Sequence, residues 1–225
     1  MKIDILTLFP KMFDGFLSES IIKRAINNNL VEINVIDFRK YSLLKNSQVD
    51  DTPYGGGAGM VLMCEPVVRA IEDLKQEDSF VILTCPQGKV HNESVANDLK
   101  KYNHLIIICG HYEGYDERIR NFVDMEISIG DFILTGGEIP AMAITDSVVR
   151  LLPGVINKDS YIEDSFTNNL LDYPTYTKPA DFRGLKVPDV LLSGNHQKIA
   201  EYRKNEQIKR TKERRPDLLE SKNEK

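Results

Sequence analysis

The sequence predicts an α/β protein, with a parallel β-sheet that carries helices on both faces, followed by a small helical C-terminal domain. Strand-like and helix-like segments alternate from Lys2 to about Leu152. The strand-like segments are nearly continuous apolar runs, which are typical of parallel strands covered on both faces. After residue 172 such runs cease, and one long charged segment of helical type dominates until Pro216 stops it.

Five strands are expected, at residues 3–9, 31–38, 80–85, 104–110 and 125–130. Helical spacing or length marks the segments between or after them, at residues 18–28, 65–75, 93–102, 116–123 and 138–152. One helix between successive strands is the pattern of a parallel sheet. Because open α/β sheets bind ligands beyond the carboxyl ends of their strands, the loops that follow the strands are the candidate sites.

A change of composition predicts two domains. The apolar pattern ends near Pro153-Gly154, and the polar stretch VINKDSYIEDSFTNN follows it. A stretch with so little to pack is typical of a linker. We therefore expect domains at residues 1–160 and 173–225, joined by a flexible linker at residues 161–172.

Charge is distributed unevenly along the chain, whose net charge is −5. Residues 173–225 contain 13 Lys and Arg against 8 Asp and Glu, which leaves 16 against 26 for residues 1–172. Positive charge is densest at residues 196–215, with eight basic and three acidic residues. A helix of this kind either presents a solvated face or contacts phosphates, and the sequence leaves both possibilities open.

The rest of the composition excludes several classes of protein. The three cysteines form no CxxC pair and the four histidines have no metal-ligand spacing, so we expect reduced thiols and no structural zinc. The N-terminus lacks the apolar region of a signal peptide, and no run approaches the roughly 20 apolar residues of a membrane span. These features predict a cytoplasmic protein that does not enter a membrane.

Glycine-marked loops follow three of the expected strands, at residues 84–88, 110–118 and 129–137. Because glycine has no Cβ, it allows a sharp turn or the close approach of a ligand. Each loop alone fits an ordinary turn, but three at one sheet edge favour a shared pocket. Neither G-x-G-x-x-G nor a P-loop is present, so a ligand held by backbone groups, such as an adenosine with a small charged tail, fits better.

A fourth loop, VDDTPYGGGAGM at residues 49–60, has four glycines between Gly55 and Gly59. Loops of this kind are candidates for a lid or for a surface that faces the substrate. Asp50 and Asp51 precede the glycines, and their spacing alone slightly favours plain solvation of the loop.

Taken together, these motifs closely resemble the bacterial tRNA (guanine-N1-)-methyltransferase family of the SPOUT class. Any one motif is only suggestive, whereas the ordered set is specific. The match runs in the family's order over nearly the whole chain, through LFPKMF, VDDTPYGGGAGM, CPQG, CGHYEGYDER, SIGDFILTGGEIPAMAITDSVVRLLPGV, EDSF, LLDYPTYTKP, VPDVLLSGNH and ERRPDLL.

The resemblance implies a SPOUT α/β-knot, in which the C-terminal part of the α/β domain is tied in a deep trefoil knot. The knot loops of the family hold the methyl donor S-adenosylmethionine, and they correspond to residues 83–88, 110–114 and 129–137. The implied donor-binding residues are Leu83, Thr84, Cys85, Pro86, Gly110, Tyr112, Glu113, Gly114, Ile129, Gly130, Asp131, Phe132, Ile133, Leu134, Gly136, Gly137 and Pro140.

The resemblance further implies a homodimer whose active sites use both chains, and tRNA as the substrate. The methyl acceptor would be N1 of the guanosine at position 37, immediately 3′ of the anticodon. The family also suggests a divalent ion, Mg²⁺, although no metal ligand is assigned. The residues implied to contact the RNA are Asp50, Gly59, Ser165, Lys209, Arg210, Arg214 and Arg215.

Two residues would carry the chemistry. Guanine N1 carries a proton and is a poor nucleophile until a base removes it, a role that the resemblance assigns to Asp164 in EDSF. It assigns Arg150 to the negative charge that develops on guanine O6. On sequence alone, Asp164 also fits a linker acid or a helix N-cap, and Arg150 fits a surface arginine at a helix end.

Two other functions stay open at this point. One is a SPOUT methyltransferase with a different acceptor, such as a ribose 2′-hydroxyl or another RNA. The other is an RNA-binding protein without catalysis, in which the basic tail matters and the glycine loops are scaffold.

Overall fold

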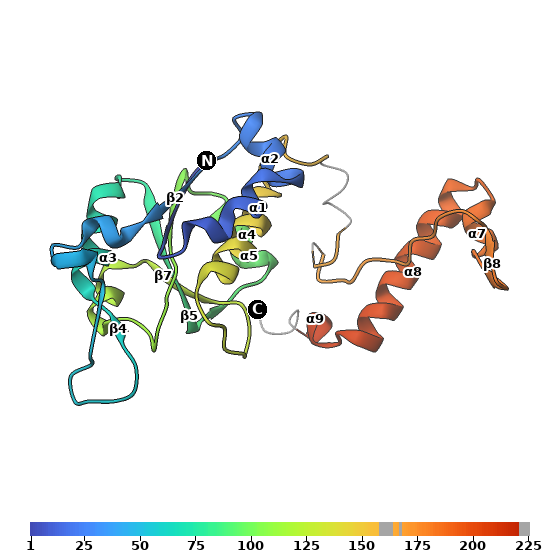
Figure 1. Ribbon diagram of the computed structural model, residues 1–225. Helices are drawn as coiled ribbons and strands as arrows, with labels where there is room; N and C mark the ends of the chain where they lie inside the picture. The colour runs from blue at the N-terminus through green and yellow to red at the C-terminus, as the bar shows by residue number, and fades with distance from the viewer. Residues whose placement is uncertain (158–163, 167, 221–225) are drawn as a thin grey trace. The chain divides into compact units, whose positions relative to one another are not determined.

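The computed structural model describes residues 1–157, 164–166 and 168–220 (Figure 1). The chain forms two compact units, Met1–Ile156 and Asn157–Lys225. The predicted boundary between the first domain and the linker, at residues 160 and 161, lies outside the described residues, as does Glu163 of the EDSF motif.

A five-stranded parallel sheet forms the centre of the first unit, with the strand order β2-β1-β6-β5-β7. The strands are β1 (Lys2–Thr7), β2 (Glu32–Asp37), β5 (Ser79–Val90), β6 (His104–Ile108) and β7 (Met125–Ser128). All five predicted strands are confirmed. β5 is longer than expected, because Lys89 and Val90 pair with β7 again after an irregularity at residues 85–88. This irregularity holds the first glycine-marked loop against β7.

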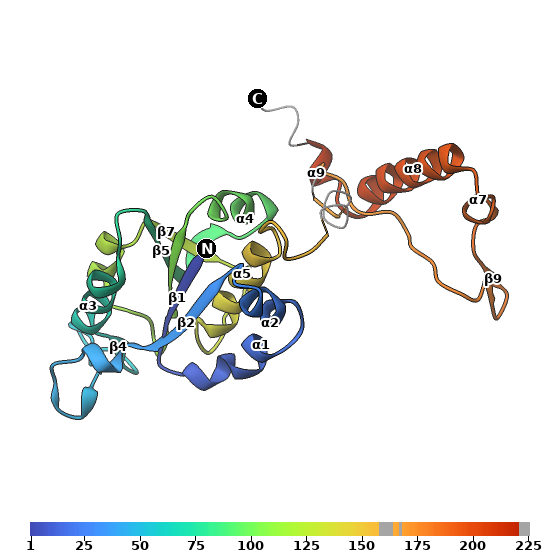
Figure 2. The same ribbon diagram turned by 90° about the horizontal axis from the view of Figure 1, so that it is seen from above.

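Helices cover both faces of the sheet, and Figure 2 shows α3 on one side and α1, α2, α4 and α5 on the other. The α-helices of this unit are α1 (Asp14–Ser18), α2 (Ser20–Asn27), α3 (Cys64–Leu74), α4 (Glu93–Leu99) and α5 (Glu138–Val149). Short 3-10 helices are η1 (Pro10–Phe13), η2 (Phe38–Tyr41), η3 (Lys45–Ser47) and η4 (Glu117–Phe122). The helix expected at residues 116–123 is therefore the 3-10 helix η4.

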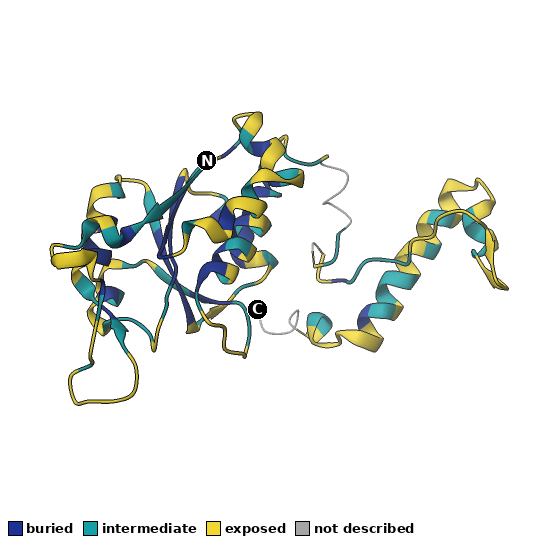
Figure 3. Cartoon of the chain, in the orientation of Figure 1, coloured by how far each residue is buried: buried dark blue, intermediate teal, exposed yellow. Residues whose placement is uncertain are grey.

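Strand side chains alternate between two hydrophobic cores, one on each face of the sheet. Ile3 and Ile5 of β1 pack in the core under α2, α4 and α5, whereas Leu6 packs in the core under α3. The central strands are accordingly the most buried part of the unit, as Figure 3 shows. Because the strands run parallel, β5, β6 and β7 end at one edge of the sheet and bring their loops together there.

The second unit is mainly helical, as predicted. Its elements are the two-stranded β8 (Asp181–Phe182) and β9 (Leu185–Lys186), and the helices α7 (Asp189–Leu192), α8 (His196–Arg214) and α9 (Asp217–Glu220). The side chain of Asn195 caps α8 by accepting a hydrogen bond from the Lys198 N–H at 3.1 Å. Thr211 is fully buried on α8, and its hydroxyl oxygen accepts a hydrogen bond from the Leu171 N–H at 2.9 Å. The segment before Tyr173 therefore packs against this helix.

None of the helices in the described ranges is long and apolar enough to cross a membrane. The trefoil knot that the resemblance implies stays a prediction.

Candidate active site

A cavity of about 270 Å³ opens where β5, β6 and β7 end. Its walls are the three glycine-marked loops and Pro140 in the first turn of α5. The predicted meeting of the three loops in one pocket is therefore confirmed. The cavity-lining residues are Thr84, Cys85, Pro86, Gly110, His111, Tyr112, Glu113, Gly114, Tyr115, Ile127, Ser128, Ile129, Gly130, Phe132, Ile133, Leu134, Thr135, Gly136, Gly137 and Pro140.

Fifteen of the seventeen residues implied to bind the donor line this cavity, and two do not. Leu83 is fully buried, because strand alternation directs its side chain into the core under α3. Asp131 is exposed and outside the lining. The sequence also missed lining residues that lie within or beside the predicted loops, namely His111, Tyr115, Ile127, Ser128 and Thr135.

Gly137 locks two of the loops together. Its N–H donates a 2.8 Å hydrogen bond to the carbonyl oxygen of Gly110. A Cβ at this position would overlap the Thr84 hydroxyl and would lie 2.6 Å from both the Cys109 Cα and the Gly110 nitrogen. Only a residue without a side chain lets the loop after β7 approach the loop after β6 so closely.

Gly137→Ala should therefore destabilise the protein by about 1–3 kcal/mol, because the backbone atoms in the way cannot swing aside like a side chain. Urea unfolding measures this loss. Gly15→Ala is the matched control, since a Cβ at Gly15 meets nothing within 4 Å. Equal stability of the two variants would contradict the proposed lock.

Buried polar groups lie behind the third loop. Glu138, in the first turn of α5, is only 2% exposed and accepts a 2.7 Å hydrogen bond from the Thr7 hydroxyl. The start of a helix favours such a negative charge. Burial, together with the Glu138 charge, raises the pKa of the Cys109 thiol well above its usual value, so this cysteine is neutral.

His111 supplies a buried nitrogen beside the cavity. Its Nδ1 has no hydrogen-bond partner among the residues that the structure describes. The ring lies 4.8 Å from the Phe9 ring and 4.9 Å, edge-on, from the Tyr112 ring, measured between centroids. A ligand in the cavity is a natural partner for such a nitrogen.

The loop at residues 49–60 is fastened to the loop after β6. Its base is the antiparallel pair β3 (Asp50–Asp51) and β4 (Val61–Leu62). Backbone hydrogen bonds of 2.8–3.0 Å join Met60 and Leu62 to residues 113–116. Gly59, at φ +81°, faces the Glu113 side chain so closely that a Cβ would overlap it. The cavity and the predicted substrate-facing loop thus form one continuous surface.

Tyr112 joins the two sides of this surface. It has a positive φ of 60°, which is uncommon for a residue with a side chain and marks a constrained backbone. Burial and the nearby Asp50 raise the pKa of Tyr112, while Arg39 opposes the shift. Arg39 is a cation that the sequence did not single out, and its Nη1 donates a 2.6 Å hydrogen bond to the Leu8 carbonyl oxygen.

Neither of the two residues implied to carry the chemistry is among the lining residues of the cavity. Arg150 follows the last residue of α5, whereas the cavity lies at the beginning of this 12-residue helix. At 1.5 Å per residue, the helix separates the two by roughly 18 Å. Asp164 belongs to the second unit, where the neighbouring Ser165 hydroxyl oxygen accepts a 3.0 Å hydrogen bond from the Asp172 N–H.

A parallel sheet whose glycine-marked loops enclose a cavity at the carboxyl edge is typical of α/β enzymes that bind a small organic ligand. The chain belongs to the tRNA (guanine-1)-methyltransferase family. The family model described as tRNA (Guanine-1)-methyltransferase TrmD matches residues 1–221. The resemblance indicated by the motifs is therefore confirmed.

Individual relatives match over nearly their full length. The chain is 61% identical over 226 residues to the tRNA (guanine-N(1)-)-methyltransferase of Bacillus pumilus (strain SAFR-032), covering 98% of this chain and 93% of the relative. It is 59% identical over 219 residues to the protein of that name from Malacoplasma penetrans (strain HF-2), covering 97% of each. A third relative of the same name, from Fusobacterium nucleatum, is 60% identical over 222 residues, covering 98% and 92%.

Proposed function

We propose that this protein transfers the methyl group of S-adenosylmethionine to N1 of guanosine 37 in tRNA, on the 3′ side of the anticodon. The observation that carries the proposal is the family match over residues 1–221, which includes the donor loops and the basic C-terminal unit. The names of the relatives favour guanine N1 over a ribose hydroxyl as the acceptor. An enzyme that acts on tRNA works where tRNA is, so we place it in the cytoplasm.

The cavity suits this donor. Its glycines expose backbone N–H and C=O groups that can recognise an adenine ring, and its apolar residues can enclose it. Glu113 lines the cavity, and Glu138 lies just behind Gly136, so negative charge faces the site where a sulfonium would bind. When bound, S-adenosylmethionine supplies a methyl group activated by a positively charged sulfur.

The chain's own residues must then prepare the acceptor. Asp164 takes the proton from guanine N1, which turns N1 into a nucleophile. Arg150 stabilises the negative charge that moves to O6 as the proton leaves. Holding the donor carbon and N1 in line lowers the activation barrier by several kcal/mol, because the two reacting atoms are then already oriented. The joined surface of residues 49–60 and 110–116 is suited to hold the target base beside the donor.

The position of Arg150 supports a site shared by two chains. At roughly 18 Å from the cavity of its own chain, it cannot reach a base that is being methylated there. In a symmetric dimer, a residue remote from its own site can serve the site of the partner. We therefore propose a homodimer in which one chain provides the donor cavity and the other provides Arg150.

The second unit has the features of an RNA-binding surface. α8 carries Lys209, Arg210 and Arg214, and Arg215 follows it. A groove of about 420 Å³ lies in the same unit, and its lining includes Tyr173, Tyr176, Lys178 and Arg203. In proteins that bind single-stranded RNA, aromatic rings stack on the bases and neighbouring cations contact the phosphates.

The double variant Lys209→Glu with Arg214→Glu reverses two exposed charges and should weaken tRNA binding by about 10-fold or more. The slope of log affinity against log salt concentration should fall by about 2 in magnitude, since each phosphate contact contributes about one unit. Filter binding at several salt concentrations measures both quantities. The paired control is Lys23→Glu with Lys101→Glu, which makes the same charge change on the first unit. A similar loss in the control would show that net charge, rather than α8, attracts the RNA.

One assay tests the proposed function. The protein is incubated with S-adenosylmethionine and unmodified tRNA, and the modified nucleoside is mapped. 1-Methylguanosine at position 37 is expected, and 2′-O-methylation would support the alternative acceptor. Failure of the folded protein to bind S-adenosylmethionine in calorimetry would favour an RNA-binding protein without catalysis.

The same assay with and without magnesium tests the metal that the family suggests. Across residues 1–157, 164–166 and 168–220, no group of three His, Cys, Asp or Glu side chains is arranged to hold a metal ion. No step above is therefore assigned to Mg²⁺.

A further inference from the structure

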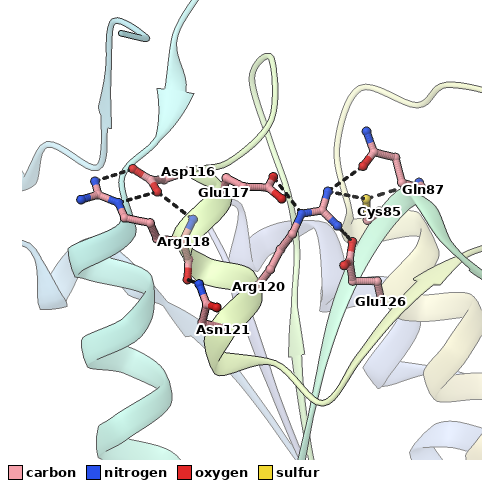
Figure 4. Close-up of polar contacts among 8 residues, drawn as sticks. All are labelled: Cys85, Gln87, Asp116, Glu117, Arg118, Arg120, Asn121 and Glu126. Atoms are coloured by element: carbon pink, nitrogen blue, oxygen red, sulfur yellow. Dashed lines mark hydrogen bonds and ion pairs between the residues drawn. The ribbon is translucent and has the colours of Figure 1, made fainter.

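Arg120, on η4, lies at the centre of a polar network next to the donor cavity (Figure 4). Its Nε donates a 2.9 Å hydrogen bond to Glu117, its Nη1 pairs with Glu126, and its Nη2 donates a 2.7 Å hydrogen bond to the Gln87 amide oxygen. The guanidinium carbon also lies 5.4 Å from the centre of the Tyr115 ring. Arg120 itself does not line the cavity.

These contacts reach the first two glycine-marked loops and the strand that leads into the third. Gln87 belongs to the first glycine-marked loop, at the irregularity within β5, and Tyr115 belongs to the loop after β6. Glu126 is on β7, three residues before the loop at 129–137 begins. A planar guanidinium with five N–H donors can hold several acceptors in fixed directions at once, which a lysine ammonium cannot do.

The surroundings of Arg120 differ from those of its neighbour Arg118, which Figure 4 also shows. The side chain of Arg118 is 72% exposed and pairs with Asp116, two residues away. The side chain of Arg120 is 23% exposed and pairs with the equally sheltered Glu126. Ion pairs sheltered from water are less screened than those on the surface, so Arg120 is the better placed of the two to fix a structure.

Arg120 contacts two residues of the cavity wall. Cys85 and Tyr115 both line the cavity, and Arg120 Nη2 lies 4.0 Å from the Cys85 sulfur. The Tyr115 hydroxyl is buried and makes no hydrogen bond of good geometry to any described residue. A movement of Arg120 would therefore disturb two residues of the cavity wall.

We propose that Arg120 is a positioning residue for the methyl donor, because it ties the first two cavity loops to β7, which leads into the third, and does not itself line the cavity. The inference rests on the proposed function, since it takes the cavity to be the S-adenosylmethionine site. It assigns a role in donor binding to a residue outside the cavity.

Arg120→Met should raise the Kd for S-adenosylmethionine by about 10-fold or more, the cost of losing a hydrogen bond to a charged group. The KM for S-adenosylmethionine should rise in parallel, while kcat at saturating donor and the KM for tRNA change by less than about threefold, since the acceptor side is untouched. The donor Kd of Arg120→Lys should lie between those of the unmodified protein and Arg120→Met. Lysine can keep the ion pair with Glu126 but not the full set of contacts. Calorimetry and steady-state kinetics measure these quantities.

Two further variants separate positioning from plain stability. Gln87→Ala removes the link to the first loop at an exposed residue, so it should fold normally and still raise the donor Kd several-fold. Glu117→Gln removes a partner that is 80% exposed and lies on the same short helix as Arg120, so it should leave the donor Kd within about twofold. Arg69→Met controls for the loss of a surface arginine paired with one glutamate.

The proposal is wrong if Arg120→Met binds the donor like the unmodified protein. It is also wrong if donor affinity falls only together with the unfolding temperature while Gln87→Ala keeps the original Kd, because Arg120 would then only stabilise the fold. If the unmodified protein fails to bind S-adenosylmethionine, the proposed function itself fails. The two failures are therefore distinguishable.

Discussion

Asp164→Asn should lower the rate of methyl transfer by about 10²- to 10⁴-fold, because the change removes the group that we propose takes the proton from guanine N1. Asparagine has nearly the same shape as aspartate but cannot accept a proton at neutral pH. The Kd for S-adenosylmethionine should be unchanged, since the donor cavity is built entirely from residues of the first unit. Single-turnover methylation of tRNA measures the chemical step, and calorimetry measures donor binding.

A matched acid in the same unit provides the control. Asp189 is exposed at the first position of α7, so Asp189→Asn removes one negative charge without touching the EDSF motif. Its methylation rate should stay within about twofold, as for most surface substitutions. Near-normal single-turnover rates for Asp164→Asn would rule out Asp164 as the base and return it to the role of a linker acid.

The strands of the first unit could be predicted because they are rich in apolar residues, above all the central strand β6, which is buried at every position. The same rule did not show that β5 resumes at Lys89 and Val90, since these residues are exposed and their pairing with β7 depends on the irregularity at residues 85–88. The periodicity of residues 116–123 suggested a helix without revealing its 3-10 geometry. Short segments of this kind are decided by their caps and neighbours rather than by spacing.

The cavity could be located from sequence because glycines mark the ends of three parallel strands. Contacts between distant residues could not be found in this way: Thr7 and Glu138 are 131 residues apart and meet only in the folded chain. Arg120 was missed for the same reason, because two of its partners, Gln87 and Glu126, lie in other segments of the chain and meet it only in the folded protein. By contrast, the distance from the cavity to Arg150 could be predicted. The expected helix at residues 138–152 begins at the third glycine-marked loop and carries Arg150 near its other end.

Arg150→Ala and Gly137→Ala should each lower the methylation rate when tested alone, and mixing them should restore activity if each site takes its cavity from one chain and Arg150 from the other. Arg150→Ala keeps an intact cavity, whereas Gly137→Ala disturbs the cavity and keeps the arginine. In a heterodimer of the two, one site combines the intact cavity with the intact arginine. Random exchange of subunits makes half of the dimers mixed, so the methylation rate should reach about a quarter of that of the unmodified protein.

The control for this experiment is each variant alone, incubated at the same total concentration and allowed the same time for subunits to exchange. Each should stay at its low basal rate, because a homodimer of either variant repeats the same defect in both of its sites. A site built within one chain predicts a different result, since neither variant then contains a complete site and mixing adds nothing. Persistent inactivity of a mixture in which tagged heterodimers are isolated would therefore contradict the shared site. The roughly 18 Å between Arg150 and its own cavity would then have to be closed by a change of conformation.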